Sequence, residues 1–363
     1  MSLSLKQAGL TPLDIWQSCH NLDNPRIRLD RIKDTAKHFK QEFMKGQPVL
    51  SVRTLPTSIA PYPVTFAFNR ACRLRYPFLL FHNKALLVQF LQNGVPKLLL
   101  MNPTIPERSA AAPFFRNLSE KLPFSNTVRH LLLESPPLPE QLQQLGIDVA
   151  DIDYVAFDHQ HVQDLRPYLG THSEPPLYPN AKYLVQQADW DSSLHQHPLQ
   201  RPWFVPGTGN DVLTDKLVLL HGDVQLGDGC VLLFTPGHTW GNQSLFFRAP
   251  ETGCYTVSEN GICMDAYTPQ YSSIPGLAAH ARKYGAEVIM NANTLEGSLD
   301  QYNSMVKEKL LADPYHGDGR FVQHFSSSEL IHSAIAPGLK PTRAIREVNE
   351  GLLQTSGKST TAV

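Results

Sequence analysis

Stretches that alternate apolar and polar residues occupy much of the chain and predict β-strands. The segments 49–55 and 64–74 alternate in this way. Residues 77–104 are typical of successive strands, with turns at Asn83–Lys84 and Asn93–Gly94. These turns divide the first half of the chain into strands that follow one another closely.

Helical patterns interrupt the strands further along the chain. The expected elements, in chain order, are a helix from residue 138 that Gly146 ends, a buried strand at 154–157, strands within 215–235, a strand pair within 242–262, and a helix followed by a strand within 274–293. Strands interleaved with helices predict an α/β fold. In such folds the chemistry is placed where strands end.

The first 48 residues have a different, helical pattern. Apolar residues recur there at steps of three or four, at Leu29, Ile32, Ala36, Phe39 and Phe43. Asp23 or Asn24 can cap this helix, and Pro25 suits its first turn. We favour a helix packed on its own domain over an arm that faces a partner, although an arm makes a homodimer plausible.

The other end of the chain is polar. We therefore expect three parts: an N-terminal helical arm at 1–48, an α/β domain at 49–335, and a polar, partly disordered tail at 336–363.

Composition narrows the classes of function. The 363 residues include 32 Lys and Arg against 33 Asp and Glu, so the net charge is −1 and no excess cation is available for nucleic acid. The apolar runs are strand-sized and far below the roughly 20 residues of a membrane helix. Five scattered cysteines without a CxxC pair indicate reduced thiols. We expect a cytoplasmic protein without a signal peptide that binds neither nucleic acid nor a membrane.

Two histidines that directly follow the buried strand at 154–157 are the strongest chemical signal. His159 and His161 are separated by one residue. In extended backbone such residues point to the same side, about 6.5–7 Å apart, so both imidazoles can reach one ion. The alternative is a pair of ordinary buried polar residues, which we consider the weaker interpretation.

Two further histidines follow strand-like segments. His238 lies in the turn TPGHTWGN after the strand LLF, and His324 follows RFVQ. His238 would complete a three-histidine cage with an open fourth position, as in catalytic zinc sites. The pair His195 and His197 has no apolar strand before it, so a surface loop is the better interpretation.

The residues of these motifs and their order along the chain resemble those of the metallo-β-lactamase-fold superfamily over roughly residues 49–335. The segment LQQLGIDVADIDYV resembles the usual approach to the HxHxDH motif, and TPGHTWGNQSL resembles the second metal-binding motif. The resemblance implies an αββα sandwich of two mixed sheets flanked by helices. It also implies that His159, His161 and His238 bind the first metal ion.

The second metal site departs from the family pattern. The motif's Asp falls on Gln163 and its final His on Asp164, while the bridging Asp falls on Glu259 or Asn260. Fewer anionic ligands lower the affinity for a second dication. We therefore expect one tightly bound Zn, and a weaker second ion on Asp164, Asn260 and His324 stays open, as do Mn and Fe.

These features together predict a metal-dependent hydrolase that activates water at the metal. Asp164 would act as the catalytic acid–base group. The fold does not choose the substrate, but near-neutral charge and aromatic residues in the loops favour a small, partly apolar ester, lactone or amide-like molecule. The alternative is a binding or regulatory protein that kept the fold and lost efficient chemistry, which the changed Gln163 and Asp164 motivate.

Overall fold

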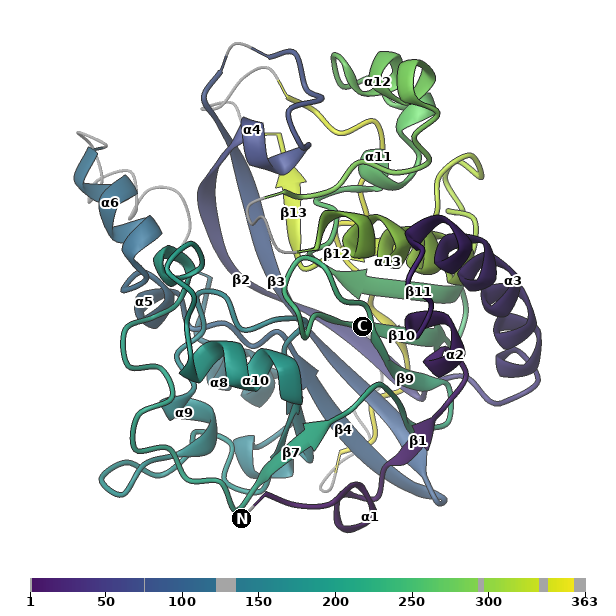
Figure 1. Cartoon of the computed structure of the whole chain (residues 1–363). Helices are drawn as coiled ribbons and strands as arrows, with labels where there is room; N and C mark the ends of the chain where they lie inside the picture. Colours follow the sequence, from purple (N-terminus) through teal and green to yellow (C-terminus); the bar gives the residue numbers. More distant parts are fainter. Residues whose placement is uncertain (1, 75, 122–134, 293–296, 333–338, 356–363) are drawn as a thin grey trace.

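Two β-sheets form the centre of the computed structural model, which describes residues 2–74, 76–121, 135–292, 297–332 and 339–355 (Figure 1). Among these residues one sheet has six strands in the order β1-β8-β9-β10-β11-β12. Its strands are β1 (Thr11–Leu13), β8 (Asp223–Gly227), β9 (Cys230–Phe234), β10 (Gln243–Ala249), β11 (Gly253–Ser258) and β12 (His324–Ser326).

The second sheet follows the order β14-β2-β3-β4-β5-β6-β7, with β13 also paired to β3. Its strands are β2 (Ser51–Pro63), β3 (Phe78–Gln92), β4 (Val95–Met101), β5 (Tyr154–Ala156), β6 (Lys182–Gln186), β7 (Leu217–Leu220), β13 (Ser328–Ile331) and β14 (Glu350–Gly351). Strands β4 to β7 pair in parallel, so the carboxyl ends of β5 and β6 meet at one edge.

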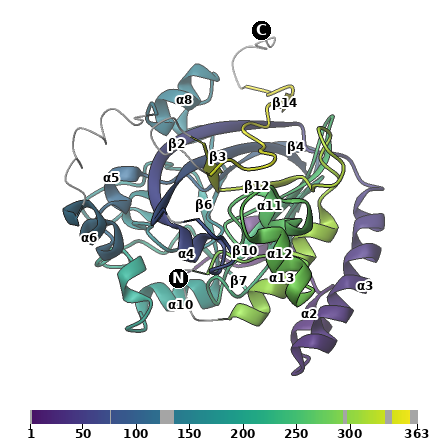
Figure 2. The ribbon, with the colours of Figure 1, turned by 90° about the horizontal axis from the view of Figure 1, so that it is seen from above.

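Helices cover the outer faces of both sheets (Figures 1 and 2). They are α1 (Leu5–Ala8), α2 (Gln17–His20), α3 (Pro25–Phe43), α4 (Val64–Ala67), α5 (Pro106–Ser109), α6 (Pro113–Lys121), α8 (Leu138–Gln144), α9 (Arg166–Leu169), α10 (Gln187–Leu194), α11 (Met264–Tyr267), α12 (Leu277–Tyr284) and α13 (Ser298–Leu311). Short 3₁₀ turns lie at Val149–Asp151, Arg201–Trp203 and Pro269–Tyr271. The predicted αββα sandwich of two mixed sheets is confirmed.

The main core lies between the two sheets, where every second residue of a strand points inward. Val88 and Phe90 of β3 meet Leu232 of β9 and Phe247 of β10 in this layer. A separate apolar cluster joins α8 and α10 to the outer face of the larger sheet, and another joins α3 and α13 to the smaller one. Burial of these side chains at roughly 25 cal/mol per Å² holds the layers together.

The N-terminal segment packs onto this sandwich. The predicted stripe is confirmed in α3, which begins after the cap residue Asn24, buries Leu29, Ile32, Ala36 and Phe39, and lies along α13 (Figures 1 and 2). Strand β1 extends the edge of the smaller sheet by pairing with β8. Through β1 and α3, the described part of residues 1–48 therefore belongs to the sandwich of the two sheets.

The C-terminal segment 339–355 also returns to the sheets. Strand β14 pairs with β2, and Ile345 and Val348 are buried in the inter-sheet core. The buried Lys84 ammonium pairs with Glu329 at 2.5 Å and donates to the carbonyl oxygen of Ile345 at 3.0 Å. Residues 339–355 of the expected tail thus contact the sheets and the core. Its other residues, 336–338 and 356–363, are not described by the structure.

Some expected elements differ in the structure. Residues 64–67 form α4 instead of a strand, because Pro63 ends the paired length of β2. No turn occurs at Asn83–Lys84, since β3 runs through it with β2 on one side and β13 on the other. The hairpin turn at Asn93–Gly94 is confirmed, and both residues have the positive φ that such turns require. Residues 288–290 are not a strand; the backbone N–H of Ile289 donates to Ala266 instead.

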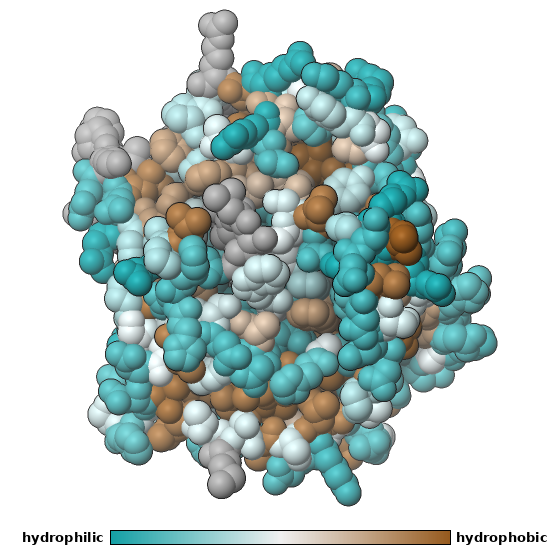
Figure 3. Space-filling view, in the orientation of Figure 1, coloured by the Kyte–Doolittle hydropathy of each residue, from teal (hydrophilic) through white to brown (hydrophobic). Residues whose placement is uncertain are grey.

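Hydrophilic side chains cover much of the face in Figure 3, with apolar residues in smaller areas between them. Within the described residues no helix has the length and apolarity that crossing a membrane requires.

Candidate metal centre

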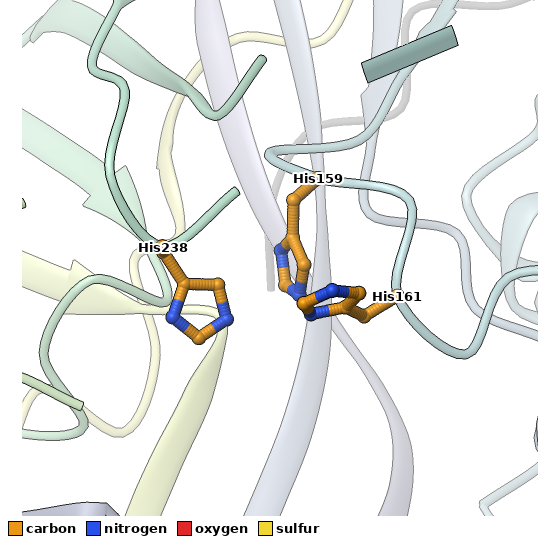
Figure 4. Close-up of side chains that lie close together, drawn as sticks. All are labelled: His159, His161 and His238. Atoms are coloured by element: carbon orange, nitrogen blue, oxygen red, sulfur yellow. The ribbon is translucent and has the colours of Figure 1, made fainter. Parts of the chain in front are cut away.

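His159, His161 and His238, here called the histidine triad, meet at one edge of the two sheets (Figure 4). One ring nitrogen from each residue lies within 4.8 Å of the others. The three side chains are buried, with exposed fractions of 4%, 2% and 0%. No other group of three or more His, Cys, Asp or Glu residues converges in this way among the described residues.

The loop after β5 presents His159 and His161. Gln243, the first residue of β10, donates from its backbone N–H to the Asp158 carbonyl oxygen at 2.8 Å and from Nε2 to the Phe157 carbonyl oxygen at 2.8 Å. These bonds tie the loop of the larger sheet to the smaller sheet. The chain then turns at Val162, whose φ is 56°.

His238 lies in the turn between β9 and β10, against the first turn of α13. Gly237 has a φ of 133°, and a Cβ there would lie 2.1 Å from the backbone nitrogen of Gln301. Glycine is therefore required at this position both by the backbone and by the close approach. The carbonyl oxygen of Gly237 accepts from the Gly297 N–H at 3.2 Å, which fixes the turn on the helix.

Hydrogen bonds orient two of the three rings. The Nδ1 atom of His159 lies 2.8 Å from Asp158 Oδ1, and Nδ1 of His238 lies 3.3 Å from the carbonyl oxygen of Asn291. When Nδ1–H donates to an oxygen, Nε2 carries the lone pair that a metal ion needs. Both ring nitrogens of the buried His161 have no hydrogen-bond partner. Buried ring nitrogens without a partner are costly, and a metal ion would satisfy the lone pair of one of them.

Electrostatics within the triad favour neutral rings at two positions. Burial, reinforced by the charges of His159 and His238, lowers the pKa of His161 well below its usual value. Burial and the charge of His159 lower the pKa of His238 to about 3. For His159 burial acts in the same direction, but the Asp158 carboxylate outweighs it and raises the pKa to about 9.

The residues present therefore fit a zinc-type ion. Three converging imidazoles are the protein donor set of many catalytic zinc sites. The buried carboxylate of Asp158 supplies the hydrogen-bond partner that metal-binding histidines usually have. The histidine triad is thus a group of side chains that could hold a metal ion.

Asp164, predicted as a ligand and as the acid–base group, is placed differently. Its carboxylate accepts from Arg166 Nε at 2.8 Å and from Nη2 at 2.9 Å, and Arg108 Nη1 lies 3.6 Å away. The structure does not bring Asp164 into the triad. Gln163 beside it is neutral and donates from Nε2 to Thr104 Oγ1 at 3.2 Å.

Asn260 and His324 are brought together, but in a second buried cluster around Glu308 of α13. Asn260 Nδ2 and the Tyr267 hydroxyl donate to the Glu308 carboxylate at 2.8 and 2.6 Å. The His324 ring stacks on Tyr267 with centroids 3.8 Å apart. We call Asn260, Tyr267, Glu308 and His324 the Glu308 cluster; the structure does not bring it into the triad.

Strand register explains why His324 turns away. It pairs with Thr256 of β11, and its Nδ1 lies 3.0 Å from Thr256 Oγ1. Ser258, two residues along β11 and so on the same face, donates to Glu308 of α13. This face points to the helices, whereas the next residue, Phe325, lies in the core between the sheets.

Glu259, the alternative to Asn260, faces the other way. Its carboxylate accepts from Ser328 Oγ at 2.8 Å and lies 3.4 Å from Asn291 Nδ2. Its charge is among those that raise the pKa of His159. Burial raises the pKa of Glu259 itself, while the charge of His159 opposes that shift. Glu259 is therefore the residue of this pair that borders the triad.

Sequence reasoning missed two residues at this site. Asn291 accepts from His238 through its carbonyl oxygen, and Asp189 of α10 has a buried carboxylate whose pKa burial raises to about 6. A Cβ on Gly241 would lie 2.3 Å from the Asp189 nitrogen, so α10 packs tightly on the His238 turn. The available signal was its place three residues after the end of β6, the same distance at which His159 follows β5.

Aromatic rings lie beside His161. The ring of Phe204 is 5.2 Å and that of Trp203 is 6.2 Å from the His161 ring, centroid to centroid. Phe114 stacks on Trp203 at 4.1 Å, and Phe66 lies 6.0 Å from Trp203. This set, which we call the aromatic wall, is a partly buried apolar cluster beside the histidine triad.

Comparison with known proteins agrees with this geometry. No family model matches the chain. It is 29% identical over 150 residues to the N-acyl homoserine lactonase AttM of Azorhizobium caulinodans, which covers 38% of this chain and 52% of that protein. It is 27% identical over 112 residues to the N-acyl homoserine lactonase of Bacillus thuringiensis, with 31% and 39% covered. The match thus spans about half or less of each curated relative.

A solved structure extends the comparison to most of the fold. AidC, described as a dizinc quorum-quenching lactonase in complex with a product, superimposes with a TM-score of 0.50 over 86% of this chain and 97% of its own, at 14% identity. The chain is a metallo-β-lactamase-fold protein. Within this metallo-β-lactamase-fold protein, the three histidines of the first metal motif converge, and the residues predicted for a second ion lie elsewhere.

Proposed function

We propose that this protein is a metal-dependent hydrolase that opens a lactone ring and holds one zinc ion on the histidine triad. The observation that carries the proposal is the convergence of three buried imidazoles within 4.8 Å. A zinc ion bound there would lower the pKa of a water ligand toward about 7 and polarise the carbonyl of the substrate.

One tightly bound ion agrees with the charges around the triad. Asp164 is already neutralised by Arg166, and Gln163 carries no charge. Asn260 donates a hydrogen bond to Glu308, and His324 stacks on Tyr267, so both belong to the Glu308 cluster. The three ligands predicted for a second dication, Asp164, Asn260 and His324, therefore offer it no uncommitted anionic oxygen. Manganese or iron in place of zinc is tested by the same metal analysis.

Residues around the triad would orient its rings and transfer a proton. Asp158 orients the His159 ring, and the Asn291 carbonyl orients His238. We assign the proton transfer to Glu259, because its carboxylate borders the triad whereas the Asp164 carboxylate is bound by a guanidinium. A carboxylate in this position can accept a proton from water and return it to the leaving alkoxide.

The aromatic wall supports a substrate with an apolar part. Phe66 and Phe114 are partly exposed, and the buried ring of Trp203 links them to His161. The curated relatives are N-acyl homoserine lactonases, whose substrates combine a lactone with an acyl chain. An acylated lactone is therefore the first compound to test.

Turnover of an N-acyl homoserine lactone, followed by separation of the ring-opened product, tests this proposal. We expect the zinc-loaded protein to open the ring and His161→Ala to have lost at least about 1000-fold in rate, because the ion and its activated water are gone. His197→Ala is the matched control, since His197 lies exposed on the loop after α10. Equal turnover in His161→Ala and wild type would refute the mechanism.

The alternative, a binding protein without efficient chemistry, has a distinct outcome. It predicts tight binding of the acylated lactone with the ring intact after prolonged incubation. A cytoplasmic location and a homodimer remain predictions. All five cysteines are free thiols in the structure, which supports a reducing compartment.

A further inference from the structure

Ser327 lies where the chain crosses from one sheet to the other. It follows β12, which pairs with β11 in the smaller sheet, and precedes β13, which pairs with β3 in the larger sheet. Its backbone N–H donates to the carbonyl oxygen of Ser258 at 3.3 Å, and its own carbonyl accepts from the Lys84 N–H at 2.9 Å. The backbone of this one residue is therefore bonded to both sheets.

The side chain of Ser327 points at the metal-binding edge. Its hydroxyl donates to Asp158 Oδ2 at 2.6 Å. The other carboxylate oxygen, Oδ1, accepts from the His159 backbone N–H at 2.9 Å and lies 2.8 Å from His159 Nδ1. Ser327, Asp158 and His159 are all buried. The three residues form a continuous chain of hydrogen bonds that ends on an imidazole of the triad.

This arrangement gives each carboxylate oxygen a separate task. Oδ1 holds the His159 ring with Nδ1 toward Asp158, so Nε2 is left to face a metal ion. Oδ2 is held by Ser327, which prevents the carboxylate from rotating away from the ring. The backbone N–H of Asp158 is fixed independently by Asn102 Oδ1 at 2.9 Å. The loop can thus stay in place while the carboxylate orientation depends on Ser327.

We propose that Ser327 is a positioning residue for the metal centre: through Asp158 it fixes the orientation of His159 and couples it to the junction of the two sheets. This inference rests on the proposed function, because it assigns Ser327 to the ion held by the triad. The Ser327 hydroxyl donates to Asp158, and among the described residues no hydrogen bond joins it to a ring of the triad, so it acts through Asp158.

The neighbouring serine provides a matched control. Ser326 is equally buried, but its hydroxyl donates to the Gly261 carbonyl oxygen at 2.7 Å and does not contact Asp158. Ser326→Ala and Ser327→Ala therefore remove the same group from adjacent buried positions, and only the second interrupts the chain to His159. Ser327→Thr retains the hydroxyl and serves as the conservative variant.

The experiment measures the Zn²⁺ affinity of the full-length protein by competition with a chromophoric chelator, together with the Tm of each metal-free variant. We expect Ser327→Ala and Asp158→Asn each to weaken Zn²⁺ binding about 10- to 100-fold, the usual effect of removing an outer hydrogen-bond partner of a ligand. Ser326→Ala should stay within about twofold of wild type, and Ser327→Thr should recover most of the affinity.

A double-mutant cycle separates positioning from general destabilisation. If Ser327 acts through Asp158, then Ser327→Ala adds little to the loss already caused by Asp158→Asn. Additive losses, or an equal loss in Ser326→Ala, would overturn the inference. Unchanged Zn²⁺ affinity in Ser327→Ala would also overturn it while the proposed function stands. A wild-type protein that binds no Zn²⁺ would instead remove the proposed function on which it rests.

Discussion

Asp164 and Arg166 form a two-pronged ion pair, in which Nε and Nη2 of the guanidinium donate to the carboxylate at 2.8 and 2.9 Å. Asp164 lies in the loop that presents His161, and Arg166 is the first residue of α9 directly after it. The oxygens of a carboxylate held in this way accept hydrogen bonds from a fixed cation and are not available to a metal ion. The pair therefore explains how a chain can retain the triad of a metal site and yet have few anionic ligands for a second ion.

The first prediction follows from this pair. Asp164→Asn should leave the zinc content near one ion per chain, because Asp164 is not in the triad. It should lower the free energy of unfolding by about 1–3 kcal/mol, since a charge-assisted pair is lost beside a partly exposed Arg166. Metal analysis and urea unfolding measure the two effects. A zinc loss as large as that of His161→Ala would instead make Asp164 a ligand.

The second prediction concerns metal removal. Zinc that binds the folded triad and not the unfolded chain stabilises the fold by mass action. At 100 times the dissociation constant this is worth about 2.7 kcal/mol. A chelator should therefore lower the Tm of wild type and have little effect on His238→Ala. An identical Tm shift in both proteins would show that the chelator acts elsewhere.

The third prediction is the pH dependence of the metal-free protein. Burial, the first cause in each case, lowers the pKa of His20, His238 and His324 to about 3. Between pH 6.5 and 3 these histidines bind protons in the unfolded chain but not in the folded protein. The free energy of unfolding therefore falls as pH falls through that window. Each residue contributes up to about 1.4 kcal/mol per pH unit.

His324→Gln provides the check on that pH dependence. Measured by urea unfolding from pH 7 to 4, the free energy of unfolding should decline less steeply for this variant than for wild type. One histidine with a lowered pKa in the folded state has been removed. Parallel curves for the two proteins would contradict the assignment. His159 acts in the opposite direction: with its pKa raised to about 9, its contribution is present below pH 6.5 and is lost as pH rises through 9.

The fourth prediction concerns the buried ion pair at the sheet junction. Lys84→Ala leaves the Glu329 carboxylate buried without its cation and should cost about 3–5 kcal/mol in the free energy of unfolding. Lys97→Ala is the control, because the Lys97–Asp153 pair is partly exposed and should be worth about 0–1 kcal/mol. Similar losses in both variants would contradict the difference in burial.

The fifth prediction tests the aromatic wall. Phe66→Ala should reduce kcat/KM for long-chain acyl lactones more than for short-chain ones, because each buried methylene contributes about 0.8 kcal/mol. Tyr284→Ala, an exposed aromatic residue on α12, is the control. A loss that is uniform across chain lengths would argue against an acyl subsite at this surface.

Local patterns indicated each histidine of the triad, and the resemblance to a known superfamily indicated that the three lie together. Period-two spacing put His159 and His161 on one side of a strand end, and Pro236–Gly237 marked the turn that presents His238. The helix over 25–43 followed from its apolar stripe and its cap at Asn24. Each of these features depends on residues close in sequence, where propensity and periodicity carry the information.

The features that sequence could not predict depend on register and distant pairing. Whether His324 faces the site or the helices is decided by its pairing with Thr256, and a shift of one residue would reverse it. The bond from Ser327 to Asp158 joins residues 169 positions apart. The choice between Glu259 and Asn260 is likewise set by contacts to Ser328 and Glu308.

Elemental analysis of the purified protein measures how many metal ions the histidine triad holds. Wild type and His161→Ala should be measured side by side after dialysis against buffer with free zinc. We expect near one zinc per chain in wild type and almost none in the variant. Two zinc ions per chain, or a content that His161→Ala leaves unchanged, would contradict a single ion held by His159, His161 and His238.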